Sequence, residues 1–185
     1  MKTKNLKIIF FLLFINIFFI NELKSQYFKQ PIPTPYVCDY IGTIKIIGYN
    51  ASQGDEIAFY DPDGVICGVF VLKKDGVFGM VHIYGDDPTT MIDEGAKSHD
   101  KLEVKIWDSK KNILYSNKNI FLKPLIIGGT ASPSEIPPKW QTNGIYAVEI
   151  SVLLAGDINL NFKLDLGDAF ILIEKLSLNQ INKNN

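Results

Sequence analysis

The feature that most constrains this chain is a series of short β-patterned runs that begins near residue 41, each closed by a turn. Residues 101–107 (Lys-Leu-Glu-Val-Lys-Ile-Trp) alternate polar and apolar side chains, which is typical of a strand with one buried face. The turns contain Gly, Pro, Asp or Lys, as in Asp-Pro-Asp-Gly at 61–64 and Lys-Lys-Asp-Gly at 73–76. Strands spaced this closely pair with their neighbours along the chain. The sequence therefore predicts a mainly β fold, an antiparallel β-sandwich.

The β-patterned runs define a β domain that we expect over residues 41–155. They are residues 43–47, 56–60, 65–72, 77–84, 101–107, 112–115 and 145–152. Before them we expect a proline-rich leader over residues 26–40, in which the prolines at 31, 33 and 35 predict neither helix nor strand for residues 30–35. Gly and Pro between 128 and 138 predict a loop or linker. The chain is polar after residue 178, and we expect a disordered tail over 179–185.

The first 25 residues have the composition of a secretory signal peptide. Lys2, Lys4 and Lys7 precede an apolar run from residue 8 to residue 19, and the small residue Ser25 follows it. The run is shorter than the roughly 20 residues that span a bilayer, and Asn16 interrupts it. We therefore expect cleavage near Ser25, secretion, and no membrane attachment of the mature chain.

Charge and composition argue against two classes of function, nucleic-acid binding and catalysis. Because residues 1–25 hold four lysines and one glutamate, cleavage changes the formal net charge from −1 to −4, which argues against nucleic-acid binding. All 19 basic residues are Lys, so no guanidinium can bind a phosphate or carboxylate through two hydrogen bonds. His82 and His99 do not fall in a common motif, so we expect neither to be catalytic. We expect a binding protein rather than an enzyme. In an oxidising compartment Cys38 and Cys67 predict a disulfide, with two buried thiols as the alternative.

One stretch near the C-terminus carries a metal-binding pattern. With Asp157 as position 1, side chains with an oxygen fall at positions 1, 3, 5, 9 and 12 of a loop: Asp157, Asn159, Asn161, Asp165 and Asp168. Lys163, at position 7, offers its backbone carbonyl. This is the spacing with which an EF-hand loop surrounds Ca²⁺ with hard oxygen ligands. The sequence thus predicts a calcium site made of these residues, followed by a short helix whose first turn carries Asp168.

Residues 156–178 resemble the calcium-binding repeat of type I dockerins, whose pattern runs Gly-Asp-x-Asn-x-Asp-Gly-x-x-Asp-x-x-Asp-Ala. The stretch from Gly156 to Ala169 carries the resemblance, and one apolar helix face is formed by Leu166, Ala169, Phe170, Ile173 and Leu176. Dockerins are modules that dock secreted proteins onto cohesin domains, often in polysaccharide-degrading assemblies. The resemblance implies an EF-hand-like loop and helix, Ca²⁺ as cofactor and a cohesin-type protein as partner.

Two positions depart from the dockerin pattern. Position 6, a glycine in the family, is Phe162, and position 5, usually an acid, is Asn161. The chain turns sharply at position 6, often with positive φ, which costs a residue with a β-carbon about 1–2 kcal/mol. Both changes should weaken calcium binding. Dockerins also carry two repeats whereas this sequence carries one, so a polar loop leading to an amphipathic packing helix stays open as the alternative.

Residues 41–108 are similar, more loosely, to the transthyretin-like or carboxypeptidase-regulatory sandwich of secreted bacterial proteins, through turns such as those at 54–55 and 61–64. This similarity implies an accessory or adhesive module. We therefore expect a secreted, calcium-binding, dockerin-like assembly protein. The alternative is a carbohydrate-binding or adhesion module in which the calcium loop is only structural. Its candidate platform for polysaccharide is aromatic, namely Trp107, Trp140, Tyr115 and Tyr146.

Two further acidic stretches are open to interpretation. Five acids crowd the loop before residue 101: Asp86, Asp87, Asp93, Glu94 and Asp100. They could converge on a second cation, or they could only set turns in a solvated loop. Asp61 and Asp63 are expected to form a hairpin turn, because they flank Pro62 and precede Gly64.

Overall fold

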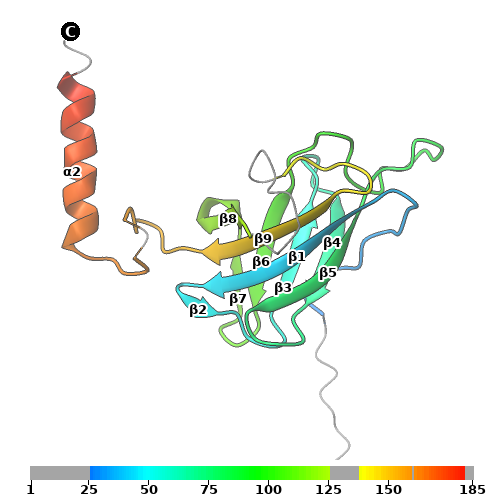
Figure 1. The fold of residues 1–185 in the computed structure, drawn as a ribbon, viewed down its shortest axis with the longest axis horizontal. Coiled ribbons are helices and arrows are strands. Elements are labelled where there is room, and N and C mark those ends of the chain that lie inside the picture. Colours follow the sequence, from blue (N-terminus) through cyan, green and yellow to red (C-terminus); the bar gives the residue numbers. More distant parts are fainter. Residues whose placement is uncertain (1–25, 126–137, 160, 182–185) are drawn as a thin grey trace, which may run out of the picture.

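The computed structural model describes residues 26–125, 138–159 and 161–181. In this part of the chain the fold is mainly β, with two sheets packed as a sandwich and one α-helix after them (Figure 1). The predicted fold class is confirmed. The signal peptide expected over 1–25, nearly all of the linker expected over 128–138, and residues 182–185 lie outside the described residues.

The first sheet is built around β1 (Val37–Ile46). One edge of β1 pairs antiparallel with β5 (Val77–Tyr84) and, further along, with the short β2 (Tyr49–Asn50). The other edge pairs parallel with β9 (Ile145–Val152), which in turn pairs antiparallel with β8 (Ile120–Pro124). Because of the parallel β1–β9 pair, this sheet is mixed rather than purely antiparallel.

The second sheet is antiparallel throughout. Its strands follow the order β4 (Ile66–Val71), β3 (Glu56–Tyr60), β6 (Glu103–Asp108) and β7 (Ile113–Tyr115). The 3₁₀ turn η1 (Asn117–Asn119) then leads the chain across to β8 in the first sheet. The β3–β4 and β6–β7 pairs are hairpins of consecutive strands. β3 and β6 are also paired, but β4 and β5 lie between them in the sequence.

The hydrophobic core lies between the two sheets. In β1 every second residue is buried, which places Cys38, Tyr40, Ile44 and Ile46 on the inner face. Gly42 belongs to the same series, and a β-carbon added there would lie 1.8 Å from the carbonyl oxygen of Val148 in β9. A side chain at this position would therefore push the two parallel strands apart.

The proline-rich segment 30–35 forms neither helix nor strand, as predicted, but the leader is shorter than the 26–40 expected. β1 already begins at Val37, because the alternation of buried and half-buried residues starts as soon as the prolines end. Upstream of the prolines, the Tyr27 ring stacks on Trp107 with ring centroids 3.9 Å apart, and Phe28 is buried. The carboxylate of Glu56 accepts hydrogen bonds from the backbone N–H groups of Tyr27 (2.8 Å) and Phe28 (3.1 Å). The leader therefore packs onto the second sheet.

Cys38 and Cys67 are both buried free thiols, so the structure shows the alternative and not the predicted disulfide. Burial raises the pKa of each thiol from its usual value of 9.0 to about 12. The Cys67 thiol donates to the backbone carbonyl of Val65 at 3.3 Å. Both cysteines thus act as small apolar side chains of the core.

The α-helix α2 (Leu166–Ile181) stands apart from the sandwich, beyond the loop that follows β9 (Figure 1). It ends at Ile181, so the tail predicted over 179–185 was wrong for its first residues, which continue the helix. Among the described residues, no helix combines the length and the apolar character needed to cross a membrane.

Candidate functional site

The predicted calcium loop begins with a sharp turn after β9. Gly156 has a φ of 96°, a conformation that glycine adopts without steric cost. The backbone N–H of Asp157 donates to the carbonyl of Leu154 at 3.1 Å and closes this turn. The turn brings Asp157 to a buried position, where 5% of the residue is exposed. A carboxylate at such a position needs hydrogen-bond donors around it.

The first half of the loop supplies these donors from its own backbone. Asp157 Oδ1 accepts the N–H of Asn161 at 3.1 Å, and Asp157 Oδ2 accepts the N–H of Phe162 at 2.7 Å. The amide oxygen of Asn159 accepts the same Asn161 N–H at 3.0 Å. The amide oxygen of Asn161 accepts the N–H of Lys163 at 2.8 Å. The side-chain oxygens at positions 1, 3 and 5 therefore each accept a backbone N–H from the turn formed by residues 161–163.

Phe162, at position 6, has a φ of 65°. This is the left-handed conformation for which dockerins carry glycine, so the expected backbone geometry is present without the favoured residue. The Phe162 side chain lies against Gly48 in the β1–β2 turn, where an added β-carbon would come within 3.1 Å of the ring. Gly48 itself has a φ of 79°. The ring thus packs the loop against the sandwich.

The second half of the loop is a helix cap. Asp165 precedes α2 and its Oδ1 accepts the N–H of Gly167 at 2.8 Å, while Asp168 Oδ2 accepts the N–H of Asp165 at 3.0 Å. This reciprocal pair is the arrangement of a capping box. Asp168 Oδ1 also accepts the N–H groups of Ile158 (2.8 Å) and Asn159 (3.2 Å). These N–H donors, foremost that of Asp165, hold the pKa of Asp168 below its usual value.

The predicted ligand residues are thus joined in one hydrogen-bond network, which the contact from Asn161 Nδ2 to Asp165 Oδ2 (3.3 Å) links across the loop. Their carboxylates do not form a compact acidic cluster. Within the described ranges, the only three acidic, His or Cys side chains whose ligand atoms all lie within 4.8 Å of one another are Asp61, Asp63 and Asp93. Backbone N–H groups, rather than neighbouring acids, surround the loop carboxylates.

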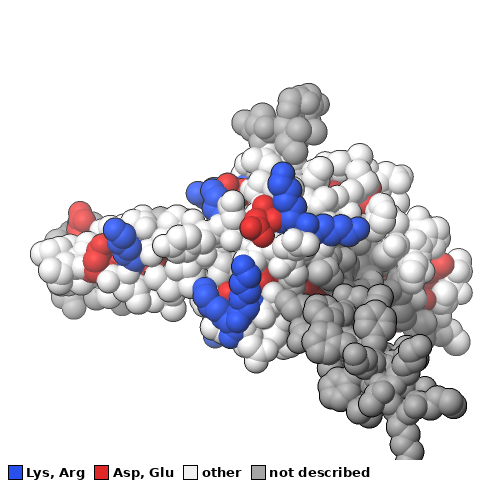
Figure 2. Space-filling view, turned by 90° about the horizontal axis from the view of Figure 1, so that it is seen from below, with Lys and Arg blue, Asp and Glu red and all other residues white. Residues whose placement is uncertain are grey.

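Helix α2 presents apolar side chains to solvent. Leu166, Phe170 and Ile173 follow one helical face and are 76%, 68% and 62% exposed. Beside this face, a shallow and mostly apolar groove runs between the loop and the first turns of the helix. Its lining includes Ile158, Leu164, Ala169 and Leu172. In Figure 2 the projecting C-terminal part is mostly white, with a few acidic and basic side chains near its end.

The aromatic residues considered as a sugar platform pack within the protein, and among them Tyr115 is half-buried against the core. Trp140 is buried and donates its indole N–H to the carbonyl of Ile83 at 3.0 Å. One face of Trp107 is covered by the Tyr27 ring, and Tyr146 packs edge-on against the core residue Tyr40. These rings serve packing, as expected for large aromatic side chains in a sandwich.

The acids before residue 101 mostly set turns. Asp87 Oδ1 accepts the N–H of Thr89 at 2.9 Å, Glu94 accepts the Thr90 hydroxyl at 2.5 Å, and Asp100 accepts the N–H of Lys97 at 2.7 Å. Asp93 differs, because it joins Asp61 and Asp63 from another loop. The predicted hairpin turn at 61–64 is present, since Asp61 Oδ1 accepts the N–H of Val65 at 2.7 Å.

Comparison of the chain with models of protein families finds no match, and comparisons with curated proteins and with solved structures find no significant match. Function is therefore inferred from the geometry of the loop, the helix and the sandwich.

Proposed function

We propose that this protein is a secreted, calcium-binding assembly module of dockerin type, which docks onto a cohesin-type protein through α2. The observation that carries the proposal is the loop from Asp157 to Asp168. Its side-chain oxygens at positions 1, 3, 5, 9 and 12 belong to one network, and its sixth residue is left-handed. Such a loop is the scaffold on which EF-hand sites are built.

The donor set suits a hard cation. Asp157, Asn159, Asn161, Asp165 and Asp168 would contribute side-chain oxygens, and Lys163 its backbone carbonyl. Each of these side chains accepts at least one backbone N–H bond. Lone pairs remain for a metal, because a carboxylate has about four and an amide oxygen has two. Calcium would reinforce the link that Asp168 makes between the start of the loop and the first turn of α2.

The exposed face of α2 supports docking. A helix that keeps Leu166, Phe170 and Ile173 in water leaves apolar area uncovered, which favours burial against a partner. The helix-in-groove mode uses anchors with this spacing. Calcium would act indirectly, by fixing the orientation of the helix that carries these anchors.

Isothermal titration with CaCl₂ tests the metal site. The full chain is compared with an Asp157→Ala/Asp168→Ala variant, and Asp75→Ala serves as control because the Asp75 carboxylate accepts the backbone N–H of Gln53 rather than one from the loop. We expect the double variant to lose one binding event that the control keeps. Identical isotherms for the wild type and the double variant would refute calcium binding by the loop.

A pull-down against a panel of cohesin domains tests docking. We expect retention with calcium, loss in EDTA, and loss for Phe170→Asp; Ile32→Asp, at an exposed apolar position of the leader, should bind like the wild type. Retention on a glycan array that survives EDTA, without cohesin binding, would instead favour the carbohydrate-binding or adhesion module. Secretion is tested by the N-terminal sequence of the exported chain, which should begin near Gln26.

A further inference from the structure

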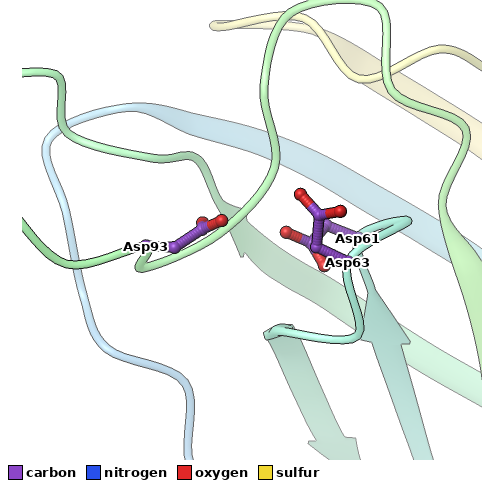
Figure 3. Close-up of side chains that lie close together, drawn as sticks. All are labelled: Asp61, Asp63 and Asp93. Atoms are coloured by element: carbon purple, nitrogen blue, oxygen red, sulfur yellow. The ribbon is translucent and has the colours of Figure 1, made fainter.

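A second group of acids lies at one end of the sandwich, away from the loop that follows β9. Asp61 and Asp63 belong to the β3–β4 turn, and Asp93 belongs to the long β5–β6 loop. One oxygen of each carboxylate lies within 4.8 Å of the other two. Figure 3 shows the Asp93 side chain directed toward the two turn residues. Two segments far apart in sequence thus bring three negative charges together.

Asp61 is the buried member of this group. Only 1% of the residue is exposed, and its Oδ1 accepts the N–H of Val65. Its Oδ2 is buried and has no hydrogen-bond partner. A buried carboxylate oxygen without a partner is costly, so native proteins provide such an atom with a donor, a water or a cation. Asp61 Oδ2 is therefore an unused acceptor inside an acidic cluster.

The cluster already attracts a positive charge. Lys97 Nζ lies 2.9 Å from Asp93 Oδ2 and 3.6 Å from Asp63 Oδ2. The Lys97 side chain is half exposed and forms no bond to Asp61 Oδ2. Three carboxylates and one ammonium leave a formal charge of −2. A monovalent group on a flexible stem thus neutralises only part of the site and can swing out into solvent.

We propose that Asp61, Asp63 and Asp93 form a second divalent-cation site, independent of the loop that follows β9, and that it takes Ca²⁺ in exchange for Lys97. Carboxylate oxygens are ligands for hard cations, and Ca²⁺ accepts irregular sets of six to eight oxygens that include waters. The exposed carboxylates of Asp63 and Asp93 leave room for such waters. The cation would clamp the β3–β4 turn to the β5–β6 loop.

The experiment uses the full chain with Asp157→Ala/Asp168→Ala, so that calcium binding by the other loop is removed. Equilibrium dialysis with ⁴⁵Ca²⁺ should still find one bound ion in this background. Adding Asp63→Asn or Asp93→Asn should weaken its binding about tenfold or more, because ligand charge sets calcium affinity. Both residues are solvent-accessible, so these variants are expected to fold, which a circular dichroism spectrum checks.

The direction in which Lys97→Gln changes calcium affinity is the decisive result. If Lys97 competes with calcium, its removal tightens calcium binding and raises the calcium-dependent increase in Tm. Asp75→Asn, in the β4–β5 turn at the opposite end of the β3–β4 pair, should leave the affinity unchanged. No bound calcium in the Asp157→Ala/Asp168→Ala background, or binding that Asp63→Asn and Lys97→Gln do not alter, would overturn the second site. Neither result bears on calcium binding by the loop that follows β9.

Discussion

At Phe162 the backbone conformation lowers the stability of the protein, whereas the packing of the ring raises it. A φ of 65° costs a residue with a β-carbon about 1–2 kcal/mol. The ring offsets part of this cost by packing over Gly48. The residue therefore keeps the shape of the loop and ties it to the β1–β2 turn, at the expense of local stability.

Two substitutions separate these contributions. Phe162→Gly removes both the strain and the ring, whereas Phe162→Ala removes the ring and keeps the strain. We expect Phe162→Gly to be more stable than Phe162→Ala by about 1 kcal/mol in urea unfolding and to bind calcium more tightly. Equal stability of the two variants would show that position 162 is not strained.

The buried thiols predict an alkaline loss of stability. Because burial raises the pKa of Cys38 and Cys67 from 9.0 to about 12, the unfolded chain ionises first and gains stability as the pH rises above 9. Near pH 10 each thiol should cost about 1.4 kcal/mol of unfolding free energy relative to neutral pH. A Cys38→Ala/Cys67→Ala variant, less stable at neutral pH, should lose less between pH 8 and pH 10.

Alkylation provides the check on the thiol state itself. The folded protein should resist iodoacetamide near pH 8 and take up two labels after unfolding without reductant. A chain that stays unlabelled after unfolding would contain the disulfide, contrary to the structure.

At the level of single residues, the sequence predicted backbone conformation where neighbouring residues or a motif determine it. The hairpin at Asp61 followed from the Asp, Pro and Gly residues that such turns need, whereas the left-handed turn at Phe162 followed only from its position in the dockerin pattern, since Phe is not a residue that such turns favour. The contact of Glu56 with Tyr27 could not be predicted, because its partner lies 29 residues away and carries no local signal. For the same reason Asp93 could be noticed as acidic, but not paired with Asp61.

At the scale of elements, the cap of α2 depends on Asp168. Its pKa is lowered in the folded protein, so its contribution to stability is present above the usual Asp value of 3.8 and is lost as the pH falls through the lower folded value. We expect the amide shifts of Ile158 and Asn159 to titrate in NMR spectra with a midpoint below 3.8. Asp168→Asn should abolish this titration and reduce the helical signal at neutral pH; a midpoint above 3.8 would contradict the lowered pKa.

The β1–β9 pair depends on Gly42. Since a β-carbon there would lie 1.8 Å from the carbonyl oxygen of Val148, Gly42→Ala should destabilise the protein by about 3 kcal/mol. The matched control is Gly79→Ala in β5, whose added carbon would lie 3.6 Å from Phe70 and should change stability by less than about 1 kcal/mol. Urea unfolding measures both, and similar values for the two variants would rule out a close approach at Gly42.

The strands with clear alternation or turn boundaries, β3, β5 and β9, have the bounds expected from sequence. β8 was not foreseen, because only Ile120 of its residues is buried and it ends at Pro124, so the run shows no period of two. The parallel pairing of β1 with β9 could not be predicted either, although β9 itself was expected as a strand. Which strand fills the middle of a sheet is decided by packing across the whole chain, not by local pattern.

At the scale of the whole molecule, the leader packs on the second sheet and stabilises it. A chain that begins at Pro31 lacks the donors that satisfy the buried Glu56 carboxylate and lacks the buried ring of Phe28. We expect it to be less stable than a chain that begins at Gln26 by about 2–4 kcal/mol, measured by urea unfolding. Equal stability would mean that residues 26–30 do not pack in solution.

The position of β9 has a consequence for the order in which this protein can fold. β9 is the last strand in sequence among those described, yet it lies between β1 and β8 and joins them into one sheet. Until residue 152 has been synthesised, β1 keeps an unpaired edge, and the first sheet cannot close. Its completion must bring together segments about 100 residues apart, a slow search by the standards of small domains. The first sheet can therefore be completed only after its last strand has been made, whereas the second sheet needs no strand later than β7.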